Sequence, residues 1–192
     1  MKTSSAIVAI VLAVWFVIIL AAGRAGVFES GSQPPLPLLA AVVGPLLLFA
    51  IVYRASDRVR RFLLSLDLRL LTALQAWRVI GIMFLALYAF GLLPGLFAWP
   101  AGVGDVAVGL AAPFVLLAML RGAPTWRAQV AWLNIAGLID FAGAVGTGVL
   151  TRSPSLGALP LSLVPTFAVP LWIMFHAISL LQLRRGSLGP RQ

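Results

Sequence analysis

Three ionisable side chains lie within long apolar runs of the sequence: Asp105, Asp140 and His176. An ionisable group inside lipid costs roughly 2.5–3.5 kcal/mol on insertion scales, so each of the three is a candidate functional residue. Two carboxylates that lie close together in a low dielectric do not both ionise. Such a pair can bind a proton or a cation, or it can activate water. The three residues are therefore the candidate proton, ion or acid–base site of the chain.

The depth of each candidate in the membrane follows from its distance along a helix to the nearest arginine. Asp140 is about 20 Å from Arg127, and Asp105 is about 24 Å from Arg121. If the two helices pack antiparallel, the carboxylates come within about 5 Å of the same depth. His176 is offset from Asp140 by about 8 Å, a gap that a water molecule or a helix kink can close. A proton path from His176 through Asp140 to Asp105 is geometrically possible.

Structural interpretations stand beside these functional ones. A lone intramembrane histidine such as His176 is often bonded to a backbone carbonyl or a hydroxyl. Asp105, at the head of its span, can accept backbone N–H bonds as a helix cap. Asp140 needs a buried partner, which favours a functional role for it. Arg78, at the inner mouth of the third span, is expected to extend to the lipid head groups. Asp140 is expected to face other helices, because its neighbours one turn away are small: Ala136, Gly137, Gly143 and Ala144.

The tetrapeptide Gly102-Val103-Gly104-Asp105 resembles the GxGD motif of intramembrane aspartyl proteases of the presenilin and prepilin-peptidase type. The resemblance implies that Asp140 would supply the second catalytic carboxylate. In that family the partner aspartate precedes GxGD, whereas here it follows, and the sequence contains no PAL motif. GxGD also falls at the outer end of its predicted span. The resemblance keeps an intramembrane enzyme among the hypotheses.

The composition requires lipid as the solvent. Of 192 residues 61% are hydrophobic and 10% are charged, whereas a soluble domain carries about 25% charged residues. The net charge of +9 does not indicate nucleic acid, because the basic residues lie between apolar runs. The chain has no cysteine, a single histidine and a single lysine, Lys2. These counts exclude disulfides, thiolate metal sites, a bis-histidine haem and a retinal Schiff base, and they indicate no metal site. Abundant arginine, alanine and glycine suggest a bacterial source.

The apolar runs predict an all-α integral membrane bundle that forms one domain over residues 1–192. Each run is close to the ~20 residues that cross the hydrocarbon core. The first is longer than a signal-peptide core and has no A-x-A cleavage site, so we interpret it as a retained helix. The six predicted spans cover about residues 6–22, 38–53, 79–97, 103–120, 129–150 and 161–183.

The distribution of basic residues predicts the orientation of the helices. With the N-terminus in the cytoplasm, the inside segments hold twelve basic residues and the outside segments hold two, which agrees with the positive-inside rule. Both termini are therefore expected in the cytoplasm, and the protein in the inner membrane. The inside residues are Lys2, Arg54, Arg58, Arg60, Arg61, Arg69, Arg78, Arg121, Arg127, Arg184, Arg185 and Arg191, and the outside residues are Arg24 and Arg152.

Residues 57–74 have the pattern of an amphipathic helix that lies in the cytoplasmic membrane interface. Apolar residues at helical spacing form one face, and Arg58, Arg61 and Arg69 lie on the other. This face is expected to contact anionic lipid head groups. A lipid-sensing or docking role is one interpretation. The other is a linker helix that joins the second and third spans.

Three classes of function remain open. The first is a small channel or transporter for a proton, ion or small solute, with Asp140 as the protonatable residue and Asp105 and His176 assisting. The second is an intramembrane enzyme that uses the two carboxylates on a lipid or peptide substrate. The third is an accessory or scaffold subunit whose small-residue faces bind partner helices or a second copy. The sequence does not name a substrate, a cofactor, a pigment or a quinone.

Overall fold

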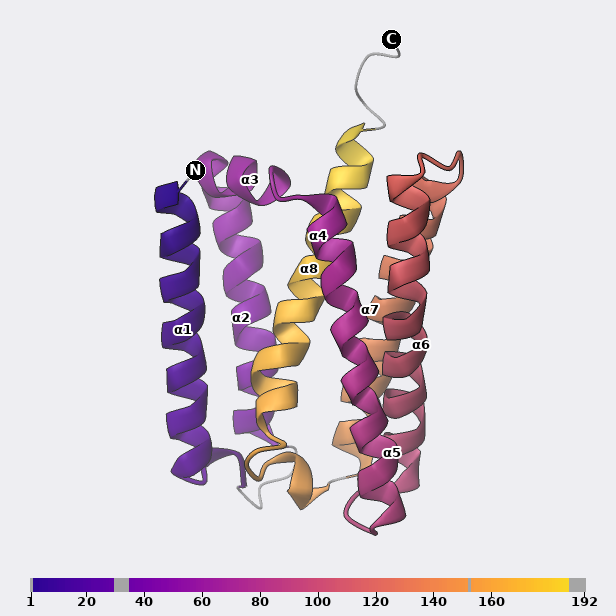
Figure 1. Cartoon of the computed structure of the whole chain (residues 1–192). Helices are drawn as coiled ribbons and strands as arrows, with labels where there is room; N and C mark the ends of the chain where they lie inside the picture. Colours follow the sequence, from indigo (N-terminus) through magenta and orange to yellow (C-terminus); the bar gives the residue numbers. More distant parts are fainter. Residues whose placement is uncertain (1, 30–34, 152, 187–192) are drawn as a thin grey trace. The chain divides into compact units, whose positions relative to one another are not determined.

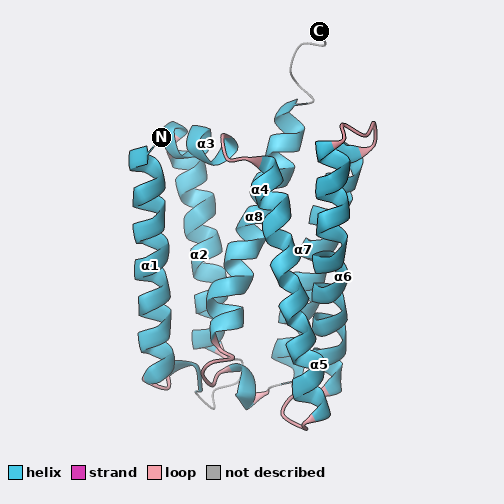
Figure 2. Cartoon of the chain, viewed as in Figure 1, coloured by secondary structure: helices cyan, strands magenta, loops and turns pink. Residues whose placement is uncertain are grey.

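In the computed structural model every regular element is a helix, as Figure 1 and Figure 2 show. The structure describes residues 2–29, 35–151 and 153–186, and no strand occurs within these ranges. The all-α class expected from the sequence is confirmed. Two arginines used in the orientation argument, Arg152 and Arg191, lie outside the described residues.

Six helices in the described ranges are long and apolar enough to cross a membrane, so the chain is a multi-pass membrane protein. The first two are α1 (Lys2–Arg24) and α2 (Leu36–Ala55), and the third joins α4 (Leu68–Leu74), η2 (Gln75–Gly81) and α5 (Ile82–Ala89). The last three are α6 (Gly95–Leu120), α7 (Trp126–Thr151) and the pair η4 (Val164–Ala168) with α8 (Val169–Gly186).

The third membrane helix differs most from its prediction. It runs over Leu68–Ala89 instead of 79–97. Arg78 falls outside the predicted span because an arginine exposed to lipid is costly, but the fold buries this arginine within the protein. The chain then turns at Gly91, which has a φ of 71°, and α6 begins after Pro94. Residues 90–97, assigned to the third span, therefore form this turn and the start of the fourth helix.

The amphipathic helix expected over 57–74 is divided into α3 (Asp57–Leu64) and α4. The Asp67 side chain accepts a hydrogen bond of 2.8 Å from the backbone N–H of Arg69. Asp67 is thus the N-cap residue of α4, and an N-cap starts a new helix instead of continuing the old one. Consequently, α3 is a short arginine-rich helix, whereas α4 is the first part of the third membrane helix.

The chain divides into two units, and the first consists of residues 1–62 and 148–171. Within it, α1 and α2 both pack on the π-helical turn η4. The ring of Phe167 in η4 lies 4.7 Å from the ring of Trp15 and 5.2 Å from that of Phe16, measured between centroids. Aromatic contacts thus join the two ends of this unit, which are far apart in the sequence.

The second unit consists of residues 63–147 and 172–192, and it contains all three predicted site residues. Within it, the third membrane helix packs along α6 through both η2 and α5. Glycines make this close approach possible: a Cβ on Gly109 would lie 2.6 Å from the backbone nitrogen of Val79, and one on Gly102 would lie 2.8 Å from Cγ of Leu85. The third membrane helix is therefore held tightly against α6.

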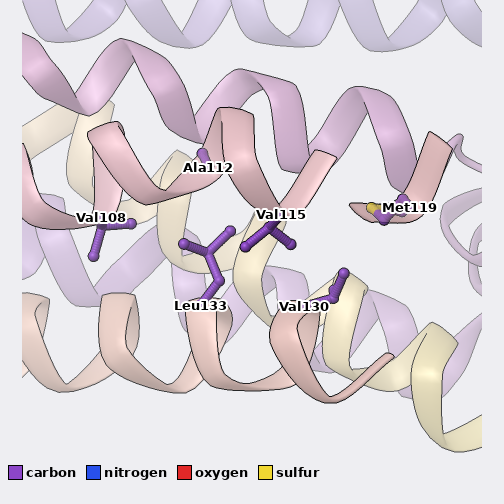
Figure 3. Packing of buried hydrophobic residues seen from close by; sticks show 6 residues of the cluster. All are labelled: Val108, Ala112, Val115, Met119, Val130 and Leu133. Atoms are coloured by element: carbon purple, nitrogen blue, oxygen red, sulfur yellow. The ribbon is translucent and has the colours of Figure 1, made fainter. Parts of the chain in front are cut away.

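The same unit contains a set of buried apolar side chains between α6 and α7, which Figure 3 draws and which we call the apolar cluster. Near it, Arg127 at the start of α7 donates a hydrogen bond of 2.7 Å to the backbone carbonyl of Leu183 in α8. The members of the apolar cluster are Val108, Ala112, Val115 and Met119 of α6 and Val130 and Leu133 of α7.

Candidate functional site

Arg78 is the centre of the candidate site. It lies near the middle of the third membrane helix, and only 3% of its surface is exposed. Its guanidinium contacts Asp105 of α6, Asp140 of α7 and His176 of α8. The expectation that Arg78 extends to the head groups is wrong, because the third helix begins at Leu68 and carries this side chain into the protein interior. We call these four residues the Arg78 cluster.

Each contact uses a different nitrogen of the guanidinium. Nε donates to Oδ1 of Asp105 at 2.7 Å, Nη2 donates to Oδ2 of Asp140, and Nη1 lies 3.0 Å from Nε2 of His176. Nε and Nη2 form one edge of the planar guanidinium, the edge along which an arginine often binds both oxygens of a single carboxylate. Here two carboxylates from two helices share that edge. Two like charges are therefore held next to each other by one cation.

Three glycines make room for this arrangement. A Cβ on Gly81 would lie 2.7 Å from Oδ2 of Asp105, and a Cβ on Gly104 would overlap the carboxylate of Asp140. A Cβ on Gly137 would overlap the His176 ring and lie 2.6 Å from Nη1 of the arginine. Small residues near the aspartates thus admit the charged side chains of neighbouring helices, in addition to letting helix backbones approach.

The structure brings the three predicted site residues together, but Arg78 joins them. Asp105 lies well inside α6, because that helix begins at Gly95. The interpretation of Asp105 as a helix cap is therefore wrong. Asp105 and Asp140 reach the same guanidinium, in agreement with the similar depths expected for them. His176 reaches Asp140 only through the arginine, so the direct path from histidine to aspartate has a cation in it.

The hydrogen bonds of His176 define its protonation. An arginine nitrogen only donates, so Nε2 of His176 accepts from Arg78 and carries no proton. The proton is then on Nδ1, which donates to Oδ1 of Asn134 at 2.8 Å. Asn134 in turn donates from Nδ2 to the carbonyl of Val130 at 2.7 Å. The histidine is therefore a neutral, fully buried group, and it positions the arginine.

The charges of the Arg78 cluster do not balance when both carboxylates are ionised. One guanidinium carries +1, the neutral histidine carries none, and two carboxylates carry −2 in total. The ring of Phe141 covers the guanidinium, with Cζ of Arg78 4.0 Å from the ring centroid, and it contributes no formal charge. A proton on one carboxyl group makes the cluster neutral, which a low-dielectric interior favours. No set of three or more metal-ligating side chains occurs in the described part of the chain.

Sequence reasoning missed three buried polar residues of this region: Arg78, Asn134 and Gln75. Gln75 is 1% exposed, and neither atom of its amide has a hydrogen-bond partner. A signal was present in the spacing of Thr72, Gln75 and Arg78, which follow each other at intervals of three and share a helix face. The spacing was obscured because residues 57–74 predict an interfacial helix, and Gln75 and Arg78 precede the span predicted from residue 79.

Residues 35–184 match the family described as a domain of unknown function (DUF8737). The chain belongs to this family. The matched region begins just before α2 and ends within α8, and it includes every member of the Arg78 cluster. No curated protein and no solved structure shows significant similarity to the chain.

Proposed function

We propose that this family member is a small membrane channel or transporter that moves protons through the Arg78 cluster. One observation carries the proposal: two carboxylates from different helices share one edge of a single buried guanidinium. This set has one acidic group more than its cation can neutralise, so it can take up and release one proton. Asp105, Asp140 and Arg78 each lie near the middle of a membrane-length helix, where such a group is costly unless it has a use.

The proton would bind and leave at a carboxyl oxygen, with Asp140 as its principal site. When a proton from water binds to Asp140, that group becomes a neutral carboxylic acid and its attraction to Nη2 of Arg78 weakens. The guanidinium keeps its bond to Asp105, so the arginine stays in place. Release of the proton restores the second ion pair. The cluster thus has two states that differ by one proton, and a proton carrier must alternate between two such states.

The same contacts favour transport over an intramembrane enzyme. An acid–base pair must present its carboxyl groups to a substrate and to water. Here both carboxylates are bound to Arg78, and the tetrapeptide glycines pack against neighbouring side chains: Gly102 against Leu85 and Gly104 against Asp140. A scaffold role is also less favoured, because the buried aspartate finds its cationic partner within this chain and needs none from another subunit.

The proposal includes the orientation and location predicted from the sequence. Both termini lie in the cytoplasm, as the distribution of arginines indicates, and the membrane is a bacterial inner membrane, as the composition suggests. In this orientation α3 lies at the cytoplasmic interface. Arg58, Arg61 and Arg69 are exposed, which supports a contact between these side chains and anionic head groups.

Proton flux in liposomes tests the proposed function. The purified protein is reconstituted with a pH-sensitive dye inside the vesicles, and a pH step or a K⁺ diffusion potential drives protons. We expect dye acidification with the wild type, and the rate of protein-free vesicles with Asp140→Asn or Asp105→Asn. Asp57→Asn is the matched control, since Asp57 is an exposed carboxylate paired with Arg60 on α3, outside the cluster. Wild-type flux in Asp140→Asn would contradict the proposal, as would a wild type that moves no protons under either driving force.

A further inference from the structure

A row of buried polar side chains extends from the Arg78 cluster along two helices of the second unit. On the third membrane helix, Thr72 and Gln75 precede Arg78, and each is 1% exposed. On α8, Ser179 follows His176 by three residues and is equally buried. A helix in lipid does not require these polar groups for its solubility. On both helices they lie on the same side of the Arg78 cluster. They form a second polar region next to the charged one.

α8 is bound on both sides of the row, by the third membrane helix at one end and by the segment just before that helix at the other. At one end Arg78 contacts His176 at 3.0 Å. At the other end Nε2 of Gln182 lies 3.3 Å from the carbonyl oxygen of Leu63 and 2.9 Å from that of Leu66. Along their own helices, Thr72, Gln75 and Ser179 lie between the charged contact at mid-membrane and the amide contact near the end of α8.

Within this row, the side-chain amide of Gln75 has no hydrogen-bond partner. Thr72 donates to the carbonyl of Leu68 at 2.8 Å, and Ser179 donates to the carbonyl of Phe175 at 2.8 Å, so each hydroxyl oxygen keeps acceptor capacity. Gln75 has neither a donor nor an acceptor partner for its amide, although the side chain is buried. A buried amide without partners is strongly disfavoured, and buried polar groups of this kind ordinarily bind water.

We propose that internal water molecules bound by Gln75 connect the Arg78 cluster to the end of the second unit at which Gln182 contacts Leu63 and Leu66. Water is the ligand that the chemistry selects, because it both donates and accepts, as the two free atoms of the amide require. A lipid chain satisfies neither atom, and no charged side chain is present in the row to hold an ion. The proposal deepens the proposed function, on which it rests, by giving protons a route to the cluster.

Protons would move along this route by exchange of hydrogen bonds. Each water accepts a proton on one side and passes a different proton to the next water, so no water needs to travel through the protein. The last transfer is to a carboxylate of the cluster. The hydroxyls of Thr72 and Ser179 can accept hydrogen bonds from the waters. The amide of Gln75 fixes the position of the chain of waters, because its nitrogen donates to one water and its oxygen accepts from another.

Accessibility of single cysteines tests the route without using proton flux. The natural chain has no cysteine, so each introduced thiol is the only one present. Ser179→Cys exchanges oxygen for sulfur at a route position, and Ile178→Cys places a thiol at an equally buried neighbour on the same helix. Ag⁺, a small hydrophilic thiol reagent, is added to oriented vesicles on the side of the C-terminal end of α8. Thiols left unreacted are then counted by alkylation after denaturation and mass spectrometry.

We expect Ser179→Cys to react with Ag⁺ at least about tenfold faster than Ile178→Cys does, because a thiolate forms only where water is present. Adding Gln75→Leu to Ser179→Cys should slow the reaction to the rate of the Ile178→Cys control. Equal rates for the two cysteines in the folded protein, or no effect of Gln75→Leu, would overturn the proposal. Thr72→Cys, with Leu71→Cys as its buried control, repeats the test on the other helix if a variant on α8 does not fold.

The outcome separates this route from the proposed function. Thiols that react as expected in a protein without proton flux would leave the water route standing and would remove the transport proposal. Proton flux in a protein with unreactive thiols would do the reverse, and protons would then reach the Arg78 cluster from another direction.

Discussion

Two buried regions of the second unit lie on some of the same helices and are held together in different ways. The apolar cluster joins α6 and α7 through six apolar side chains that pack against each other without directional bonds. The Arg78 cluster joins the third membrane helix, α6, α7 and α8 through directional bonds to one guanidinium. In lipid, apolar side chains gain little by leaving the solvent, so the apolar cluster contributes mainly packing.

This difference between packing contacts and directional bonds indicates which cluster specifies the helix register. A sliding motion by one residue along α6 or α7 would exchange one apolar contact for another in the apolar cluster. The same motion would withdraw Asp105 or Asp140 from the guanidinium and leave a buried charge without a partner, which is far more costly. We therefore expect the Arg78 cluster to determine how the helices align, and the apolar cluster to determine how tightly they pack.

The largest expected effect is that of Arg78→Gln. This change leaves two buried carboxylates without their cation, and breaking a buried ion pair in this way costs about 3–5 kcal/mol. Unfolding in detergent, followed through the fluorescence of the six tryptophans, measures the free energy. The control is Arg121→Gln, an exposed arginine at the end of α6, for which we expect a change within about 0.5 kcal/mol. Similar stabilities of the two variants would show that the cluster does not specify the register.

A triple replacement sharpens this first prediction. When Arg78, Asp105 and Asp140 all become leucine, no charge is left unpaired, and well-packed apolar groups often substitute for buried ion pairs without loss of stability. We expect the triple variant to recover most of the stability lost in Arg78→Gln and to conduct no protons. A triple variant as unstable as the single one would mean that the shape of these side chains matters more than their charges.

Gly104→Ala is expected to have the next largest effect. The new Cβ would overlap the carboxylate of Asp140, a short side chain that Arg78 holds in place. Overpacking of this kind costs about 2–3 kcal/mol, and displacement of Asp140 should also reduce proton flux. Gly146→Ala on α7 is the control, because a Cβ there meets no atom within 4 Å, and it should stabilise the helix by about 0.5–1 kcal/mol. Equal effects of the two alanines would remove the proposed steric role of Gly104.

The membrane helices and three of the four Arg78-cluster residues could be predicted from the sequence. Long apolar runs predict membrane helices because length and hydropathy are properties of one segment. The same argument identified Asp105, Asp140 and His176, since an ionisable residue in such a run stands out by itself. All three proved to lie in one cluster.

The buried position of Arg78 could not be predicted, because it depends on residues of other helices. An arginine at the edge of an apolar run can belong to a loop or to a span, and only the presence of buried carboxylates nearby decides between them. Two aspartates in predicted spans that contain no cation, 103–120 and 129–150, were the available signal. Asn134 and Gln75 were missed for a different reason. A neutral amide costs less to insert into lipid than an ionisable group does, and a single sequence does not reveal whether it faces lipid or a neighbouring helix.

The smallest expected effect comes from the apolar cluster, through Leu133→Ala. Leu133 is buried between α6 and α7, and its truncation leaves a cavity but no unpaired polar group. We expect a loss of about 2 kcal/mol, the low end for such truncations, because lipid also solvates the leucine of the unfolded helices. Proton flux per folded molecule should stay at the wild-type rate.

Ile139→Ala is the matched control for this last prediction, because Ile139 lies on the same helix with 67% of its surface exposed, and its truncation should change stability by less than about 0.5 kcal/mol. Proton flux and the free energy of unfolding are measured on the same variant and compared. If Leu133→Ala stops proton flux in a folded protein, the apolar cluster also positions the carboxylates, and the separation of alignment from packing fails. If flux persists, helix packing can loosen while the guanidinium keeps both aspartates in register, as a charge-specified alignment requires.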